Sequence, residues 1–249
     1  MQIENRVRGS LLSGAVADAF GSLYENQLPE FGCEFRYSSF STTTDDTQLS
    51  LATCKSIRLE KGIIPAKIAA NFLQLYLGEG IRGIGSTTHK NDEAFAGALA
   101  VALTVRAATS GIPIDSVIES IIDHIPDTRL KDSILGLHKY NDSSIRETAK
   151  AVGNSGFVAE SVPLAIFAAT KIKEKGIVEI LEEVVQCGGD TDTIASMTAQ
   201  ISGAFIGLDH EIVAGLDKLD EKNEIVKTVD EFSKYVSTLV TNKSMERNL

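Results

Sequence analysis

Apolar residues recur at three- and four-residue steps along most of the chain, and this helical period constrains the fold more than any other feature. In residues 116–125 (SVIESIIDHI) the aliphatic side chains fall on one side of a helix, and residues 177–187 (IVEILEEVVQC) repeat the pattern. Asp115 is placed to cap the first of these helices and Pro126 to end it. Only residues 35–40 alternate weakly, and we expect a loop there. The pattern predicts an all-α protein.

Two of the predicted helices are apolar on nearly every side, namely residues 94–108 (AFAGALAVALTVRAA) and 193–207 (TIASMTAQISGAFIG). Small side chains allow such helices to pack closely in the middle of a helical protein. No repeat, linker or change of composition divides the chain, so we expect one domain over residues 1–240 and a frayed tail at 241–249. The further segments predicted to be helical are 66–77, 93–108, 161–173, 193–206 and 222–240.

The charge balance and the cysteine content exclude several classes of protein. The 249 residues include 24 basic and 34 acidic side chains, giving a net charge of −10. Because this excess of carboxylates repels phosphate backbones, we do not expect binding to nucleic acid. The 3 cysteines are far apart, which favours a reducing cytoplasm over a disulfide framework. We expect no signal peptide and no membrane span, because no apolar run has the required length and flanks.

Two similar acidic clusters occur where predicted helices begin, at residues 43–48 (TTDDTQ) and 188–193 (GGDTDT). Asp and Thr are good N-caps and the helix dipole favours acids there, so either cluster alone could be a cap. Capping needs only one side chain, however, and the repulsion between neighbouring carboxylates suggests a compensating cation. Carboxylate and hydroxyl oxygens suit Mg²⁺ or Mn²⁺. If the clusters converge, they could hold two ions that position and activate a water for hydrolysis.

A third feature lies in residues 14–25 (GAVADAFGSLYE). Asp18 is a lone acid inside a predicted helix of small residues, where it could cap or bond locally. Glu25 follows a Gly-Ser break, so we expect it on a loop just after this helix. A carboxylate in that place could face a cleft.

Together these segments resemble the ADP-ribosylglycohydrolase family. The resemblance covers most of residues 6–207, and GSLYE (21–25) resembles the serine-directed branch of the family. The matching segments, in the family's order, are GAVADAFG (14–21), TDDT (44–47), THKNDEAFAGALAVAL (88–103), GFVAESVPLAIFAA (156–169) and GGDTDTI (188–194).

The resemblance implies an all-α orthogonal helical bundle that binds two Mg²⁺ ions, with Mn²⁺ as an alternative. It implies hydrolysis of the bond at the ribose C1″ of free or protein-linked ADP-ribose conjugates. Glu25 and Asp46 would be catalytic and would help to deprotonate the attacking water, while Phe157 would stack on adenine. The implied metal ligands are Thr44, Asp45, Asp46, Asp190, Asp192 and Thr193. The implied substrate contacts are Asp18, Gly85, Ser86, His89 and Phe157.

The chain departs from the family pattern at Ala17, where Gly is usual, at Lys90, where Pro is usual, and most of all in one internal stretch. Typical members carry a stretch between an R-G-x-G segment and the T-H segment, including a G-N-G-x-x-M-R motif that helps to form the substrate pocket. Here GIRGIGS (80–86) runs directly into the T-H segment. The metal motifs are intact while one pocket wall is shortened. Two alternatives therefore stay open, a non-catalytic or altered-substrate member that binds metal or ADP-ribose, and an all-α Mg²⁺ phosphohydrolase. The sequence leaves the oligomeric state open.

Overall fold

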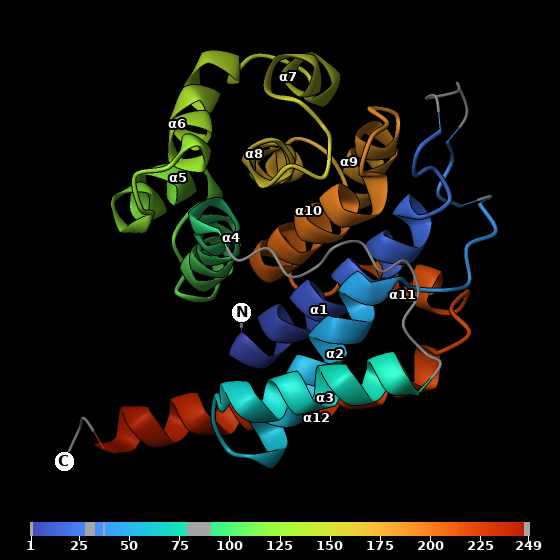
Figure 1. The fold of residues 1–249 in the computed structure, drawn as a ribbon, viewed down its shortest axis with the longest axis vertical. Helices are drawn as coiled ribbons and strands as arrows, with labels where there is room; N and C mark the ends of the chain where they lie inside the picture. Colours follow the sequence, from blue (N-terminus) through green and yellow to red (C-terminus); the bar gives the residue numbers. More distant parts are fainter. Residues whose placement is uncertain (1, 28–32, 37, 79–90, 247–249) are drawn as a thin grey trace.

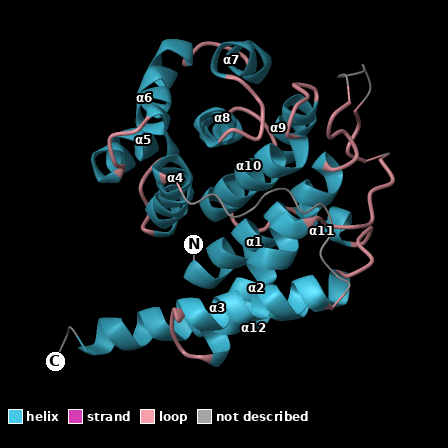
Figure 2. Ribbon diagram, in the orientation of Figure 1, coloured by secondary structure: helices cyan, strands magenta, loops and turns pink. Residues whose placement is uncertain are grey.

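The computed structural model describes residues 2–27, 33–36, 38–78 and 91–246. Within these ranges the backbone is helical or irregular and contains no strand, as Figure 2 shows, which confirms the predicted all-α class. The α-helices are α1 (Ile3–Gly21), α2 (Asp45–Leu59), α3 (Pro65–Leu77), α4 (Asp92–Thr109), α5 (Val117–Ile121), α6 (Arg129–Gly136), α7 (Ile145–Val152), α8 (Val158–Thr170), α9 (Ile177–Val185), α10 (Thr191–Ile206), α11 (His210–Leu216) and α12 (Lys222–Glu246).

Helices α1 and α10 run side by side through the middle of the molecule (Figure 1). Their close approach depends on glycine. A Cβ added at Gly9 would lie 2.4 Å from the backbone carbon of Gly207, and one added at Gly203 would lie 2.2 Å from the carbonyl oxygen of Gly9. The small residues of the C-terminal apolar segment thus have the central role that their composition predicts.

The other helices pack on both sides of this pair. Helices α4 to α8 lie on one side, where α4 and α8 contact α10, and α2, α3 and α12 lie on the other, where α2 and α12 contact α1 (Figure 1). The core includes fully buried aliphatic and aromatic side chains from the central and flanking helices, such as Leu12, Phe20, Leu130 and Ile166. Among the described residues, no helix combines the length and apolar character needed to cross a bilayer.

Several predicted boundaries differ from those observed. The helix predicted over residues 116–125 is reduced to α5, with short 3₁₀ turns before and after it. The prediction that Asp115 caps this helix is wrong, because its carboxylate pairs with Lys173. Helices α6, α7 and α11 were not predicted, since each is too short to show a repeated apolar period. Helix α12 continues past residue 240 to Glu246, and the limits of the single domain stay a prediction.

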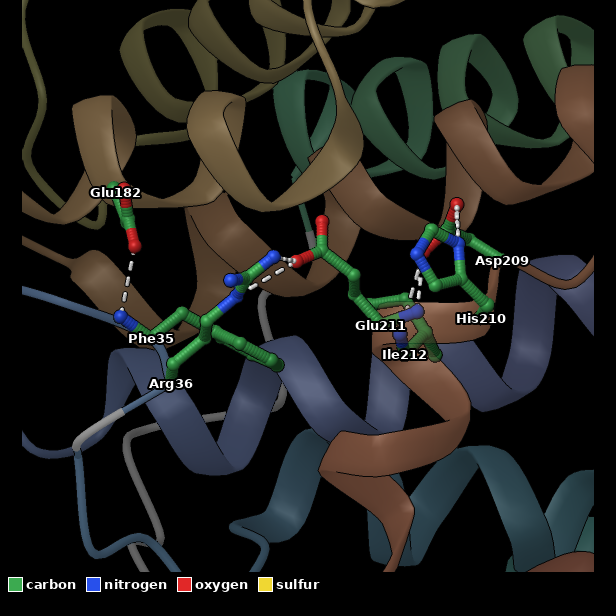
Figure 3. A network of polar contacts seen from close by, with 7 residues as sticks. All are labelled: Phe35, Arg36, Glu182, Asp209, His210, Glu211 and Ile212. Carbon is green, nitrogen blue, oxygen red and sulfur yellow. Dashed lines mark hydrogen bonds and ion pairs between the residues drawn. The ribbon is translucent and has the colours of Figure 1, made fainter.

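The loop that leads into α2 is held against α9 and α11, as Figure 3 shows. The Phe35 N–H donates to Oε1 of Glu182 at 2.8 Å, and the Arg36 guanidinium donates twice to Oε1 of Glu211, at 2.5 and 3.0 Å. Asp209 caps α11 by accepting from the N–H groups of Glu211 and Ile212 (Figure 3). These contacts confirm the irregular structure predicted around residues 35–40.

A lysine from the turn after α11 fastens the same loop. The Lys218 ammonium donates to the carbonyl oxygens of Phe35, Arg36 and Ser38 at 2.9 to 3.0 Å. It also lies 4.7 Å from the ring centroid of Phe40, a cation–π contact. Burial lowers the pKa of Lys218, because removal from water disfavours the charged form. Lys218 therefore holds the described residues Phe35, Arg36 and Ser38 beside the turn after α11.

Candidate metal centre

A buried acid in α1 fixes the start of α2. The Asp18 side chain is fully buried, and its carboxylate accepts hydrogen bonds from the N–H and the hydroxyl of both Thr44 and Thr47, at 2.5 to 3.3 Å. Burial raises the pKa of Asp18, and these hydrogen bonds act in the opposite direction. Asp18 does not line the cleft described below, so it holds α2 in place instead of making the implied contact with substrate.

The second acidic cluster depends on a tight turn before α10. Gly188 and Gly189 have φ angles of +73° and +79°, and a Cβ at Gly189 would lie 2.1 Å from the carbonyl oxygen of Asn154. That oxygen accepts from the N–H of Asp190 at 3.0 Å. The Asn154 amide donates to the carbonyl oxygens of Cys187 and Gly188, at 2.8 and 3.0 Å. Asn154 thereby sets the position from which Asp190 leaves the turn.

The end of α1 meets this turn. The Thr191 hydroxyl donates to the carbonyl oxygen of Gly21 at 2.8 Å, which joins the start of α10 to the last residue of α1. Beyond α1 the chain turns through Asn26, which has a φ of +57° and whose N–H approaches the carbonyl oxygen of Gly189 at 3.5 Å. Glu25 lies exposed on this turn, which is the loop position that the sequence predicts.

These turns bring three acids together. Glu25, Asp190 and Asp192 each offer a carboxylate oxygen, and these oxygens all lie within 4.8 Å of one another. Asp192 is 8% exposed, whereas Glu25 is open to solvent. A group of three carboxylates at this spacing can supply oxygen ligands to one hard divalent cation.

The first acidic cluster lines the same cleft. This cleft has a volume of ≈ 1300 Å³ and lies between the starts of α2 and α10, the helices α4 and α8, and the loop before α8. Apolar side chains of α4 also line it, namely those of Ala98, Val101, Ala102 and Val105. The predicted site residues that line the cleft are Glu25, Asp45, Asp46, Asp190, Asp192 and Thr193.

Burial and mutual repulsion change the acidity of these carboxyl groups. Burial, followed by the charge of Asp18, raises the pKa of Asp46 to about 7, although a hydrogen bond with Thr193 opposes the shift. Burial and the hydrogen bond with Asp190 raise the pKa of Asp192 to about 8. The pKa of Asp45 is raised by burial, then by the charges of Asp18 and Asp190. A bound divalent cation would relieve this repulsion, and the oxygen donors suit Mg²⁺ or Mn²⁺.

Thr44 differs from the other implied ligands. It is the N-cap of α2, its hydroxyl accepts from the N–H of Asp46 at 3.4 Å, and the same hydroxyl donates to Asp18 at 2.6 Å. Thr44 is not one of the described residues that line the cleft. The capping and metal-binding interpretations therefore apply to different members of one cluster, because Thr44 caps while Asp45 and Asp46 face the cleft.

The implied substrate contacts are only partly described. Phe157 is 38% exposed between two residues that line the cleft, and the guanidinium carbon of Arg129 lies 5.1 Å from its ring centroid. Gly85, Ser86 and His89 lie outside the described residues.

Sequence analysis missed two residues that organise the site. Asn154 is distant in sequence from the turn that it holds, and no local pattern marks it. Thr47 stands in the TDDT motif, but its bond to Asp18 depends on the packing of α1 against α2. The glycine pair before Asp190 is the signal that a close backbone neighbour exists, without indicating which residue it is.

The fold and the acidic cleft define an all-α protein with a candidate divalent-metal site, and comparison with known proteins gives its family. The ADP-ribosylglycohydrolase family model matches residues 1–87 and 78–240, so the chain belongs to the ADP-ribosylglycohydrolase family. The two matched segments overlap at residues 78–87, which include the GIRGIGS segment. The family is named for ADP-ribosylglycohydrolase activity.

A solved structure shares the fold. It is described as an ADP-ribosylglycohydrolase-related protein complex, with a TM-score of 0.72, 19% sequence identity, and coverage of 94% of this chain and 99% of that one.

Three curated relatives match this chain over only part of their own length. The ADP-ribosylhydrolase ARH3 of Xenopus tropicalis is 27% identical over 158 residues, which are 51% of this chain and 45% of that protein. The uncharacterized protein YegU of Escherichia coli is 25% identical over 193 residues, which are 71% of this chain and 54% of that protein. An uncharacterized protein of Archaeoglobus fulgidus is 27% identical over 119 residues, 47% of this chain and 38% of that protein. The chain thus spans about half or less of the length of these curated relatives.

Proposed function

We propose that the protein is a Mg²⁺-dependent hydrolase that cleaves the glycosidic bond at the ribose C1″ of an ADP-ribosyl conjugate. The convergence of two separate acidic motifs in one cleft supports this most strongly. Asp45 and Asp46 from the start of α2 line the same cleft as Asp190 and Asp192 from the start of α10. Glu25, from the turn after α1, lines it too.

Two Mg²⁺ or Mn²⁺ ions fit the donor set. Asp45 and Asp46 would serve from one side, and Asp190, Asp192 and Thr193 from the other, while Thr44 caps α2 and holds the two aspartates in place. The raised pKa values of Asp46 and Asp192 support this assignment, because burial first and the neighbouring acids second disfavour their anionic forms, which a bound cation would favour. When bound, the ions would orient the ribose hydroxyls and increase the acidity of a water molecule.

A carboxylate of the chain would then accept the proton of the attacking water. Water attacks C1″, the bond to the leaving group breaks, and the proton of the water passes to a carboxylate. Glu25 fits this role because it is exposed on a turn and its carboxylate oxygen lies within 4.8 Å of those of Asp190 and Asp192. Asp46 is the second candidate, since its carboxylate lines the same cleft as those of Glu25 and Asp192.

The rest of the cleft would hold the ADP-ribosyl group. Ala98, Val101 and Ala102 give the cleft an apolar part beside its acids, and a volume of ≈ 1300 Å³ is ample for a ligand of this size. Phe157 at the rim would stack on adenine. We also assign the reaction to the cytoplasm, an assignment supported by Cys33, Cys54 and Cys187, which form no disulfide among themselves.

A direct test measures release of ADP-ribose from serine- and arginine-linked peptides across a Mg²⁺ titration. Asp46→Asn and Asp192→Asn should abolish turnover, and Asp142→Asn, which changes an exposed acid outside the cleft, should not. Circular dichroism would show that each variant folds. Turnover equal to that of the wild type in both cleft variants would contradict the proposal. Release of inorganic phosphate in place of ADP-ribose would indicate a phosphohydrolase.

The shortened segment favours one alternative, a member of the fold that binds metal or ADP-ribose without turnover. Residues 80–86 run directly into the T-H segment, which removes part of the family's pocket wall. Calorimetric titration of ADP-ribose, with and without Mg²⁺, separates the alternatives. Mg²⁺-dependent binding without turnover on either peptide would support the binding protein, and repeated turnover would exclude it.

A further inference from the structure

An arginine at the start of α6 lies at the rim of the acidic cleft. The N–H groups of Arg129 and Leu130 donate to the two carboxylate oxygens of Glu93, at 2.8 and 3.0 Å. The residue after Glu93 is Ala94, which lines the cleft. The guanidinium carbon of Arg129 lies 5.1 Å from the ring centroid of Phe157. Arg129 therefore contacts both the start of α4 and the residue that precedes α8.

The contact with Phe157 places this cation close to the acidic end of the cleft. Gly156 and Val158, on either side of Phe157, both line the cleft. Gly156 also lies against Asp190, since a Cβ added at Gly156 would be 3.1 Å from the Oδ2 atom of Asp190. Adjacent Cα atoms are about 3.8 Å apart, so one residue step separates this contact from the ring beside Arg129. A ligand held at Asp190 that extends along this rim would reach the guanidinium.

The charges of the cleft show why an anionic ligand needs this cation. The described residues that line the cleft include five carboxylates and no Lys, Arg or His side chain. A diphosphate would therefore be repelled by the acids and would gain from a cation beyond them. Lys131 is already paired with Asp127 at 2.8 Å, whereas in the described part of the chain no carboxylate pairs with the Arg129 guanidinium. Arg129 is exposed, so its guanidinium can bind an anion without first losing an acidic partner.

We propose that Arg129 is a specificity-determining residue that binds the diphosphate of the substrate while Phe157 stacks on adenine. This inference rests on the function proposed above and adds the group by which the protein distinguishes an ADP-ribosyl conjugate from an unphosphorylated riboside. The planar guanidinium presents its N–H donors in a fixed fork that matches phosphate oxygens. Phe157 remains 38% exposed beside the guanidinium, so its ring can still receive a base.

Substitution of the Arg129 side chain should leave the fold intact. Glu93 accepts from main-chain N–H groups, so its contacts with the start of α6 do not depend on the guanidinium. The Thr128 side chain caps the same helix by accepting from the N–H of Lys131 at 3.3 Å. Arg129→Met and Arg129→Lys therefore form a matched pair. Both keep a long side chain beside Phe157, and only lysine keeps the positive charge.

Calorimetric titration of ADP-ribose in excess Mg²⁺ tests the assignment. Arg129→Met should weaken binding roughly 10- to 100-fold, as expected for lost charge-assisted hydrogen bonds. Arg129→Lys should bind with an affinity between those of Arg129→Met and the wild type, because lysine keeps the charge without the fork. The control is Arg106→Met, which changes an exposed arginine of α4 that is not one of the described residues lining the cleft. This control should bind ADP-ribose as the wild type does.

Two results of this titration would overturn the proposal. The first is wild-type affinity in Arg129→Met. The second is an equal loss of affinity in Arg129→Met and Arg129→Lys, which would show that Arg129 only supports Phe157. A wild type that binds no ADP-ribose would contradict the proposed function together with this inference, whereas wild-type binding that Arg129→Met leaves unchanged would contradict the role of Arg129 alone.

The dependence of ADP-ribose binding on salt gives an independent measurement. The wild-type Kd should rise between about 0.05 M and about 0.5 M NaCl, because salt screens the attraction between an exposed guanidinium and a diphosphate. Arg129→Met should show a weaker dependence, since it lacks this charge. Equal salt dependence in the wild type and Arg129→Met would overturn the proposal.

Discussion

The carboxylate of Asp18 and the hydroxyl of Thr44 lie 2.6 Å apart, in a hydrogen bond that joins the middle of the molecule to the first acidic motif. Thr44 immediately precedes the two aspartates that face the cleft, so this bond fixes the direction in which α2 begins. Thr47, one turn further on, donates to the same carboxylate at 2.5 Å. A buried acid outside the cleft thereby determines where two of the proposed ligands lie.

Replacement of Asp18 should therefore cost both stability and metal binding. Asp18→Ala leaves two hydroxyls and two N–H groups without their acceptor, which should lower the free energy of unfolding by about 2–3 kcal/mol. Urea denaturation in EDTA measures this loss apart from any metal effect. The matched control is Thr53→Ala, since the Thr53 hydroxyl donates to the carbonyl of Leu49 within the same helix, α2. A loss no greater than that of the control would show that Asp18 does not hold α2.

The raised pKa values of Asp46 and Asp192 predict how the stability of the metal-free protein depends on pH. In the unfolded chain these groups titrate near 3.8, whereas in the folded protein they titrate at about 7 and about 8. The folded state thus keeps protons that the unfolded state releases, and its stability should fall as pH rises from about 4 to about 8, then level off. Thermal melts in EDTA measure the fall. Asp46→Asn/Asp192→Asn should flatten the profile, and an unchanged slope in this variant would assign the fall to other groups.

With Mg²⁺ present, the stability of the protein should no longer fall as pH rises, because the cation binds the ionised carboxylates. Protons and the cation compete for the same carboxylates, so Mg²⁺ affinity should increase with pH until Asp46 and Asp192 are ionised. Calorimetric Mg²⁺ titrations at about pH 6 and about pH 8.5 measure the competition. Equal Mg²⁺ affinity at the two pH values would show that Asp46 and Asp192 do not bind the cation.

The sequence predicts correctly those features that depend on residues close to one another in the chain. The two acidic clusters, the loop position of Glu25 and the central role of the small-residue segment 193–206 each follow from neighbouring residues. The burial of Asp18 and the contact between Asn154 and Gly189 do not, because they depend on which helices pack together. Asp115 shows the opposite error, since a good local cap was available and a partner from a distant turn, Lys173, bound it instead.

Asn154 should control metal affinity through the turn that it holds. Asn154→Ala removes the two hydrogen bonds to the carbonyls of Cys187 and Gly188, which frees the turn that presents Asp190. Mg²⁺ affinity measured by calorimetry should fall roughly 10- to 100-fold, as for other residues that orient metal ligands. Asn141→Ala, which changes an exposed amide, is the control and should bind Mg²⁺ as the wild type does. Normal affinity in a destabilised Asn154→Ala variant would reduce the role of Asn154 to stability alone.

Two glycine substitutions should change the free energy of unfolding in opposite directions. In Gly9→Ala the new methyl group would lie 2.4 Å from the backbone of Gly207. The contact between α1 and α10 must open, at a cost of about 3 kcal/mol or more, because backbone cannot move aside as a flexible side chain does. In Gly136→Ala, within α6, the methyl group meets nothing within 4 Å, and the variant should gain up to about 1 kcal/mol from reduced backbone entropy in the unfolded state. Urea denaturation of both variants measures the difference. A Gly9→Ala variant as stable as the wild type would mean that α1 and α10 pack less closely than described.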